Sequence, residues 1–369
     1  MKTVLIDRSK TLQQEPQTGH NRWHPDIPPI LEVEPGEEVL METRDALDGQ
    51  FHSGTTEADF ANLDPGPIHP LTGPVFVKGA APGDLLEIQF IEIKPEPYAF
   101  TAIIPGFGFL RDLYTDPFLV HWKIEDNAAT SEQLPGVRIP GAPFMGVSGL
   151  APSMELLAEW TRRENDAIAA GGMALPPDAG GAVPAEGAAA PDGARTLPPR
   201  ESGGNFDVKQ LTAGSSLFLP VYTEGSLFST GDAHFAQGDG EVCVTAVEMS
   251  ASVTLKFQVH KGEAASKNIR APRFSHPGYF QTPEMASPKN FVGVMGYPIR
   301  EDGTNEAENL TLACRNAVLH MIELLQERGF SREQAYAICS VGVDLRISNV
   351  VDVPNFTVSA LLPEAIFVK

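Results

Sequence analysis

The sequence predicts a mainly β fold: a β-sandwich or barrel-like body followed by an α+β part at the C-terminus. The 369 residues include 34 glycines and 32 prolines, and such frequent turn residues favour sheets over a helical bundle. Apolar and polar side chains alternate over residues 247–259, as in a strand with one buried face. The clearest helical spacing lies near the C-terminus, over residues 305–328.

The first hundred residues predict short strands joined by turns. Residues 3–6 form a first apolar run, and a Pro-Gly turn precedes a second run that ends near Asp45. Residues 75–78 and 85–93 predict two more strands, on either side of a Pro-Gly-Asp turn. The side chain of Asp45 shares the inward parity of the preceding strand and stands at its end. It therefore fits either a site residue or an ordinary turn cap.

The later segments predict helices and then, over residues 343–363, a return to strand with a proline break. Residues 154–170 have helical spacing, and the Ala-, Gly- and Pro-rich tract 171–193 predicts a flexible connection, or one ordered only by contacts elsewhere. The helix at 305–328 is followed by Gly329, and a second helix is expected from the cap Ser331 to about Ser340. We therefore expect a β-rich body over residues 1–260 and an α+β subdomain over residues 261–369.

Charge and composition exclude several classes of partner. The formal net charge is −21, which argues against binding to nucleic acid or to an anionic membrane surface, because both need clustered cations. The three cysteines show no CxxC spacing, so neither a disulfide framework nor a thiolate zinc site is indicated. The N-terminus does not resemble a signal peptide, and no apolar run approaches a membrane span. A cytoplasmic protein is the expectation.

A dense polar group stands between the two strand-like runs of residues 203–259. Its members are Asp232, His234, Gln237, Asp239 and Glu241. Asp232 and His234 are two residues apart, so in a strand their side chains emerge on the same face. Extending the parity of residues 247–259 backwards through residues 245 and 243 turns Glu241 inward, although a bulge at the Gly-Asp-Gly turn could reverse this parity. A carboxylate that faces the interior requires a metal, a cation or hydrogen-bond donors.

These residues predict a metal or catalytic site. One imidazole with two carboxylates, completed by Asp45 from another strand, suits zinc, manganese, nickel or iron, whereas a carboxylate-only subset would suit calcium or magnesium. The alternative is a hairpin end whose Asp and Gly residues only form the turn. Asn205, Asp207 and Lys209 form a second alternating polar set, which fits either a solvated strand face or the same site.

Other hydrolase chemistries find little support in the sequence. It contains neither a G-x-S-x-G nucleophile elbow nor an HExxH zinc motif. The cysteines lie within helical or strand-like patterns, which disfavours a cysteine nucleophile. No glycine-rich loop precedes a helix in the way that phosphate binding requires.

Five motifs, in this order along the chain, resemble the acetamidase/formamidase family: HNRWHPDIPP, ETRDALDGQ, HPLTGPVFVKGAAPGDLLEI, GGNFDVKQL and GDAHFAQGDGEV. The similarity extends from about His20 to the C-terminus, with an irregular insertion at about residues 107–200 as in the longer members. It implies an amidohydrolase that cleaves short aliphatic amides such as formamide or acetamide, or a γ-lactam. It also implies a β-rich fold with an α+β part, a divalent metal, most often zinc, and a homo-oligomer.

The resemblance also implies the positions of the site, which match its motifs at Asp45, Asn205, Asp207, Asp232, His234, Asp239 and Glu241. Our hypothesis makes Asp45, Asp232 and His234 the metal ligands and Glu241 the base that activates water. Asp207 and Lys209 are further candidates for catalysis, and Asn205 or Lys209 could stabilise the oxyanion.

Asn205, Gln237 and Phe144 are candidates for substrate binding, with Phe107 and Phe109 near Phe144 as a pocket wall. His69, in HPLTGP, fits a surface histidine better than a ligand. The alternative function is a non-catalytic β-sandwich module that binds calcium or a small ligand through the same acidic hairpin. A covalent amidase that uses Lys or Cys243 is a third, weaker possibility.

Overall fold

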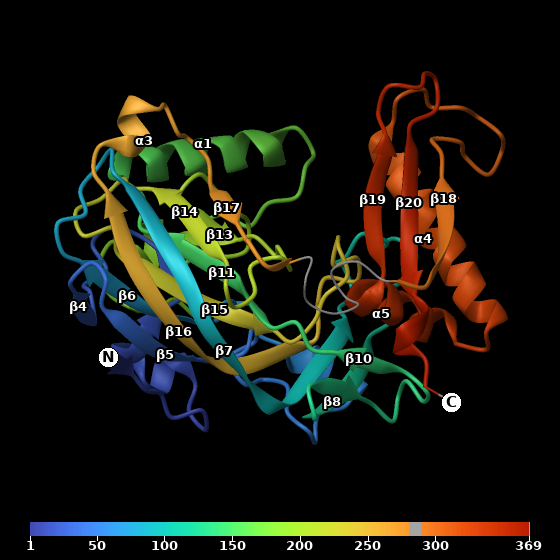
Figure 1. Ribbon diagram of the computed structural model, residues 1–369, viewed down its shortest axis with the longest axis horizontal. Helices are drawn as coiled ribbons and strands as arrows, with labels where there is room; N and C mark the ends of the chain where they lie inside the picture. The colour runs from blue at the N-terminus through green and yellow to red at the C-terminus, as the bar shows by residue number, and fades with distance from the viewer. Residues whose placement is uncertain (280–288, 369) are drawn as a thin grey trace.

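The computed structural model describes residues 1–279 and 289–368. Two units lie side by side, a large β-rich body and a smaller C-terminal unit of three strands and two helices (Figure 1). Within the described residues, fifteen strands belong to one sheet of the body. The predicted mainly β fold with an α+β C-terminal part is confirmed. The same residues contain no helix with the length and apolar character needed to cross a membrane.

The strands of the body are β1 (Lys2–Val4), β2 (Gly19–His20), β3 (Arg22–Trp23), β4 (Leu31–Val33), β5 (Glu38–Thr43), β6 (Leu71–Val77), β7 (Leu85–Ile103), β8 (Phe118–Glu125), β9 (Ala128–Thr130), β10 (Arg138–Pro140), β11 (Phe144–Leu150), β12 (Ala194–Arg195), β13 (Gly203–Asn205), β14 (Ser216–Pro220), β15 (Phe228–His234), β16 (Glu248–His260) and β17 (Arg273–Ser275). Those of the C-terminal unit are β18 (Phe291–Gly296), β19 (Asp344–Asn349) and β20 (Thr357–Pro363). The helices are α1 (Met154–Ala169), α2 (Ala189–Asp192), α3 (Glu263–Ser266), α4 (Leu310–Glu327) and α5 (Arg332–Gly342).

Two long antiparallel strands, β7 and β16, form the centre of the body (Figure 1). The main strand order is β10-β9-β8-β7-β16-β15-β11-β13, and β16 also pairs with β5. The alternation predicted from the sequence is present in β16, where Ala251, Val253, Leu255 and Phe257 are fully buried. Burial of these apolar side chains away from water is the main contribution to the stability of the sheet and the core it packs on.

The predicted backward extension of β16 is wrong. The strand begins at Glu248, and the preceding residues form turns in which Glu241 and Val244 have φ values of 42° and 88°. Contacts with the C-terminal unit explain this path: a Cβ at Gly238 would lie 2.2 Å from the carbonyl oxygen of Val343, and the N–H of Gly238 donates to the carbonyl of Ser340 at 2.8 Å. Residues 238–247, named here the acidic loop, are thus shaped by tertiary packing.

The C-terminal unit is a three-stranded antiparallel sheet in the order β18-β20-β19, packed against α4 and α5. Both predicted helices are present. The first begins at Leu310, later than predicted, because the side chain of Asn309 accepts a hydrogen bond from the N–H of Leu312 and caps the helix there. The second begins after the predicted cap Ser331. The body sheet continues past residue 260, because β17 pairs with β14.

The insertion at residues 107–200 is more regular than predicted, since it contains β8 to β11 and α1. Its glycine-rich tract is ordered by contacts from elsewhere, which was one of the two expectations for it. Asn21 donates to the carbonyl of Gly181 at 2.8 Å and accepts from the N–H of Val183 at 2.8 Å, and Arg22 donates to the carbonyl of Asp178 at 2.8 Å. Buried polar side chains of the HNRWHP motif therefore supply the ordering that the tract lacks in itself.

Candidate active site

The candidate site lies where three strands of the same part of the body sheet, β13, β15 and β16, end or begin. Asn205 ends β13, His234 ends β15 and Glu248 begins β16. In the sheet register, His234 is directly opposite Glu248 on one side and opposite Phe144 of β11 on the other. Directly opposed residues of antiparallel strands project to the same face, so pairing brings together groups that are far apart in the sequence.

His234 is held in one orientation and one tautomer. Its Nδ1 lies 2.9 Å from Oε1 of Gln237, whose Nε2 donates to the carbonyl of Asp207 at 2.8 Å. Since Oε1 can only accept, Nδ1 carries the proton of the neutral ring. The ring of Phe144 contacts the imidazole edge to face, with centroids 5.0 Å apart. These contacts direct Nε2 away from the core and towards the carboxylates.

Three carboxylates surround that nitrogen. Nε2 of His234 lies 3.1 Å from Oε2 of Glu248, 3.3 Å from Oδ1 of Asp232 and 3.9 Å from Oε1 of Glu241. His234, Asp232 and Glu248 are each at most 3 % exposed. So many acidic groups out of contact with water require a compensating positive charge, either a proton on His234 or a metal ion.

The proton equilibria reflect this crowding. Burial raises the pKa of Asp207 and that of Glu248 to about 7 in each case, and burial with the charge of Asp207 raises the pKa of Glu241 well above its usual range. Burial alone would lower the pKa of His234, but the charges of Glu248 and Asp232 raise it well above 6.5. Burial alone would raise the pKa of Asp232, but the charges of His234 and His69 hold it below the usual range. Displaced pKa values that gather at one place are typical of functional sites.

The donor set fits a metal ion. Two groups of described residues bring their ligand atoms within 4.8 Å of one another: Asp232, His234 and Glu248, and Asp207, His234 and Glu241. Oδ1 of Asp207 is buried without a hydrogen-bond partner among the described residues, and Oε2 of Glu248 is buried with Nε2 of His234 3.1 Å away. Acceptors in such an environment point to a bound cation or proton. Both groups share Nε2 of His234, which can ligate one ion at a time.

A cavity of about 630 Å³ opens onto these carboxylates. Asp232, Glu241 and Glu248 line it together with Asn205 and His69. Asn205 contributes a buried Oδ1 that has no hydrogen-bond partner among the described residues. Glu241 faces the site, as predicted. The cause is the turn of the acidic loop, whereas the prediction had relied on strand parity.

His69 and Glu248 are the site residues that the sequence argument missed. His69, expected at the surface, is 9 % exposed and places Nε2 4.0 Å from Oδ2 of Asp232. In the alternation over residues 247–259, Glu248 falls on the polar face, which the pattern predicts to point away from the core. This face of β16 is the polar one. At Glu248, the first residue of the strand, the candidate site covers that face, and Glu248 lies directly opposite His234. The register between β15 and β16 was the missing information.

The cavity lining does not include several other predicted residues: Asp45, Phe144, Asp207, Lys209, His234, Gln237 and Asp239. Oδ1 of Asp45 accepts the N–H groups of Leu47 at 2.9 Å and Gly49 at 3.2 Å, which is the turn-capping alternative. Asp45 belongs to neither metal-capable group of the described residues. We therefore replace it by Glu248 in the ligand set. Gln237 and Phe144 support the ring of His234 from behind, where they have no access to a substrate.

Lys209 also lies outside the cavity lining, between the body and the C-terminal unit. Its Nζ forms a short, buried ion pair with Asp344 of β19 and lies 4.0 Å from Oδ2 of Asp239. Oδ1 of Asp344 also accepts the N–H of Asp239 at 3.1 Å. Lys209 and Asp239 thus anchor the acidic loop to the C-terminal unit, and the catalytic role of Lys209 stays a prediction. Phe107 lines the cavity, whereas Phe109 does not.

Gly146 of β11 provides the space that two of the carboxylates occupy. A Cβ there would lie 2.8 Å from Oδ1 of Asp207 and 2.9 Å from Oδ2 of Asp232. We expect Gly146→Ala to lower kcat/KM by about 10- to 100-fold, as displaced metal-supporting groups do, and to lower the metal content. The control is Gly278→Ala, whose Cβ would meet no atom closer than 4.0 Å. Equal activity of the two purified variants would contradict this account of Gly146.

Comparison with known proteins places the chain in a family. Residues 5–369 match the model of the acetamidase/formamidase family. Acetamidase from Mycolicibacterium smegmatis is 38 % identical over an alignment of 358 positions that covers 90 % of this chain and 87 % of that protein. Formamidase from Methylophilus methylotrophus is 34 % identical, over 100 % of this chain and 94 % of its own length. The structure of a gamma lactamase from Delftia acidovorans superimposes with a TM-score of 0.93 at 37 % identity, covering 100 % of this chain and 93 % of that one. As the sequence motifs predicted, the chain belongs to the acetamidase/formamidase family.

Proposed function

We propose that this protein is a metal-dependent amidohydrolase that cleaves the C–N bond of carboxamides, with acetamide, formamide and γ-lactams as the substrates to test first. The names of its relatives support the reaction. The structural observation that carries the proposal is the position of His234 Nε2, which lies within 3.9 Å of the carboxylates of Asp232, Glu241 and Glu248 at the wall of a cavity.

Asp232, His234 and Glu248 would hold the ion, because they are the nearest and most deeply buried set. One imidazole nitrogen with two carboxylates suits zinc, which we propose as the metal. The central imidazole disfavours calcium, which takes oxygen ligands, and so disfavours the calcium-binding module. When bound, such an ion polarises the amide carbonyl and lowers the pKa of a coordinated water.

Glu241 and Asp207 would move the protons. Burial raises the pKa of both groups, and the charge of Asp207 raises that of Glu241 further, so the pair retains a proton near neutral pH. Glu241 lines the cavity and can take a proton from the attacking water and return it to the departing nitrogen. Asp207, behind it, would share that proton and keep Glu241 in a basic yet protonatable state.

Asn205 and His69 would orient the substrate. The unpartnered side-chain oxygen of Asn205 can accept an N–H of the amide group, which pays for its burial. The hydroxyl of Thr196 accepts the N–H of His69 at 2.6 Å and lies 3.5 Å from Nδ1 of the same residue. This contact leaves Nε2 of His69 directed to Asp232 and the cavity, where it can donate to the carbonyl oxygen.

The test is release of ammonia from acetamide and formamide, and ring opening of 2-pyrrolidinone, by the purified protein with its metal content measured. We expect a divalent metal near one per chain, loss of turnover on chelation and recovery with zinc. Glu241→Gln should lose about 100-fold or more in kcat, whereas the exposed control Glu125→Gln should not. Full activity after complete metal removal would refute the metal-dependent mechanism.

We also propose a homo-oligomer. Exposed apolar side chains on the C-terminal unit support it: Phe291 and Met295 of β18, and Val351 and Val353 after β19. Analytical ultracentrifugation of the metal-loaded protein would determine the subunit number.

A further inference from the structure

The cavity is far larger than a short amide requires. Acetamide and formamide have only a few heavy atoms, whereas cavities of the size seen here, about 630 Å³, hold drug-sized ligands. A substrate that fills only the carboxylate-lined part would leave the remaining volume to water. The composition of that remaining wall is therefore informative about the substrate.

The wall away from the carboxylates is mainly apolar, with Glu57 and Arg195 as its charged members. Its side chains come mainly from residues 46–68 and 104–117, whereas the carboxylates come from the strand ends and the acidic loop. Six of these apolar residues also belong to one hydrophobic cluster packed on Phe51 and Phe100: Ala46, Leu47, Phe60, Leu63, Ile68 and Ile104. The cluster gives the wall a fixed shape, so an apolar group placed against it would displace water at no cost in hydrogen bonds.

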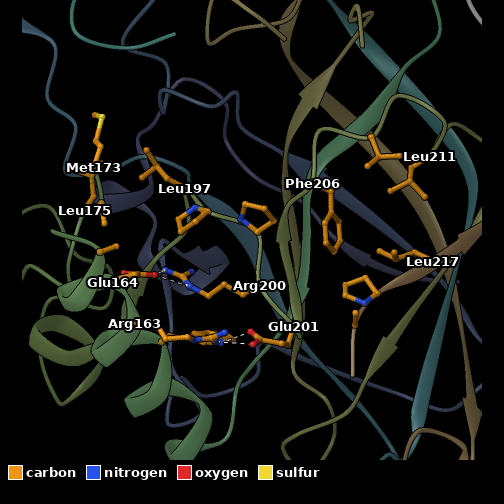
Figure 2. Close-up of a pocket in the computed structure, with 18 of the residues that line it drawn as sticks. Arg163, Glu164, Met173, Leu175, Leu197, Arg200, Glu201, Phe206, Leu211 and Leu217 are labelled. Carbon is orange, nitrogen blue, oxygen red and sulfur yellow. Dashed lines mark hydrogen bonds and ion pairs between the residues drawn. The ribbon is translucent and has the colours of Figure 1, made fainter. Parts of the chain in front are cut away.

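A second, larger cavity adjoins the first and is shown in Figure 2. It measures about 860 Å³. Leu175 and Leu197 lie on one side of it, with Phe206, Leu211 and Leu217 facing them. Phe107, Leu175 and Leu197 line both cavities. These three side chains, named here the partition, therefore separate the space at the carboxylates from the second cavity.

The charged groups of the second cavity do not demand a charged ligand. Arg163 pairs with Glu201 at 2.7 Å, and Arg200 pairs with Glu164, as Figure 2 shows. Arg200 also lies over the ring of Trp160, with its guanidinium carbon 4.8 Å from the ring centroid. With these charges neutralised among themselves, the remaining surface of the second cavity is apolar and suits the end of a hydrocarbon chain.

Resting on the proposed function, we propose that the preferred substrates are primary carboxamides whose acyl group is apolar and about the size of a six-membered ring. The amide group lies at the carboxylates, the acyl group lies against the apolar wall, and the partition sets the upper limit of acyl length. Each methylene buried against such a wall is worth about fourfold in kcat/KM. Hydrolysis remains the same reaction: water adds, the C–N bond breaks, and ammonia and the carboxylic acid leave.

The first experiment is a substrate series with the zinc-loaded, full-length enzyme: acetamide, butanamide, cyclohexanecarboxamide and octanamide. We expect kcat/KM to rise at least about tenfold from acetamide to cyclohexanecarboxamide and to fall for octanamide. Activity that is highest for acetamide and declines with acyl size would overturn this inference while leaving the proposed function intact. Failure to hydrolyse any amide would instead defeat the proposed function.

The second experiment opens the partition. Leu197→Ala removes a half-buried side chain common to both cavities, so octanamide should gain about tenfold in kcat/KM relative to acetamide. The matched control is Met173→Ala, which removes an exposed side chain, 56 % exposed, that lines only the second cavity. An unchanged octanamide-to-acetamide ratio in Leu197→Ala, with unfolding by urea like that of the wild type, would overturn the role of the partition.

Discussion

Replacement of His234 by alanine is expected to abolish amide hydrolysis and to remove the bound metal. The ring provides the only nitrogen in either metal-capable group of the described residues. Loss of about 4 kcal/mol of transition-state stabilisation corresponds to about 1,000-fold in kcat/KM. Because the carboxylates would remain without their cationic partner, the variant should also lose stability. Ammonia release and metal content, both measured on the purified variant, check the expectation.

A second histidine provides a matched control. His260 also lies among carboxylates, with Nε2 2.8 Å from Oε2 of Glu87 and Nδ1 3.9 Å from Oε2 of Glu263, but it is half-exposed and distant in the sheet from the site. His260→Ala should keep both metal and turnover. If His234→Ala retains a stoichiometric metal and more than a tenth of the wild-type activity, His234 is not a ligand and the proposed site is refuted.

Lys209→Met is expected to destabilise the protein by about 3 kcal/mol, in line with the removal of one partner from a buried ion pair. Both members are buried: the side chains of Lys209 and Asp344 are 4 % and 3 % exposed. Because Asp344 also binds the backbone of Asp239, loss of the pair should loosen the acidic loop and move Glu241. We therefore expect kcat to fall more than KM changes. Urea unfolding followed by tryptophan fluorescence gives the free energy of unfolding.

Two further variants separate burial of the charge from loss of a surface ion pair. Lys2→Met removes a pair with Glu37 whose side chains are 39 % and 40 % exposed, so its stability should not change measurably. The double variant Lys209→Met, Asp344→Leu removes both buried charges and should recover part of the lost stability. If Lys209→Met unfolds at the same urea concentration as Lys2→Met, the proposed anchoring of the loop is contradicted.

Local patterns in the chain were sufficient to predict the longer helices and several of the strands. The alternation in β16, the cap Ser331 and the helical spacing of α4 all depend on neighbours within a few residues. The start of β16 was wrong for the opposite reason: the turns of the acidic loop are imposed by Ser340 and Val343, about a hundred residues away. Contacts between residues so far apart produce no periodic pattern in the sequence, so they could not be predicted from it.

The sequence by itself determined the family, the β-rich body with its α+β end, and the attribution of a site to Asp232, His234 and Glu241. Tertiary structure alone decided which groups complete it. Strand pairing set Glu248 opposite His234, burial brought His69 to Asp232, and an ion pair between the two units holds Lys209 beside Asp344. Residue type records what a side chain can do, but the distance between two charged atoms depends on sheet register and domain packing. That distance decides whether a carboxylate caps a turn, as Asp45 does, or binds an ion, as we propose for Glu248.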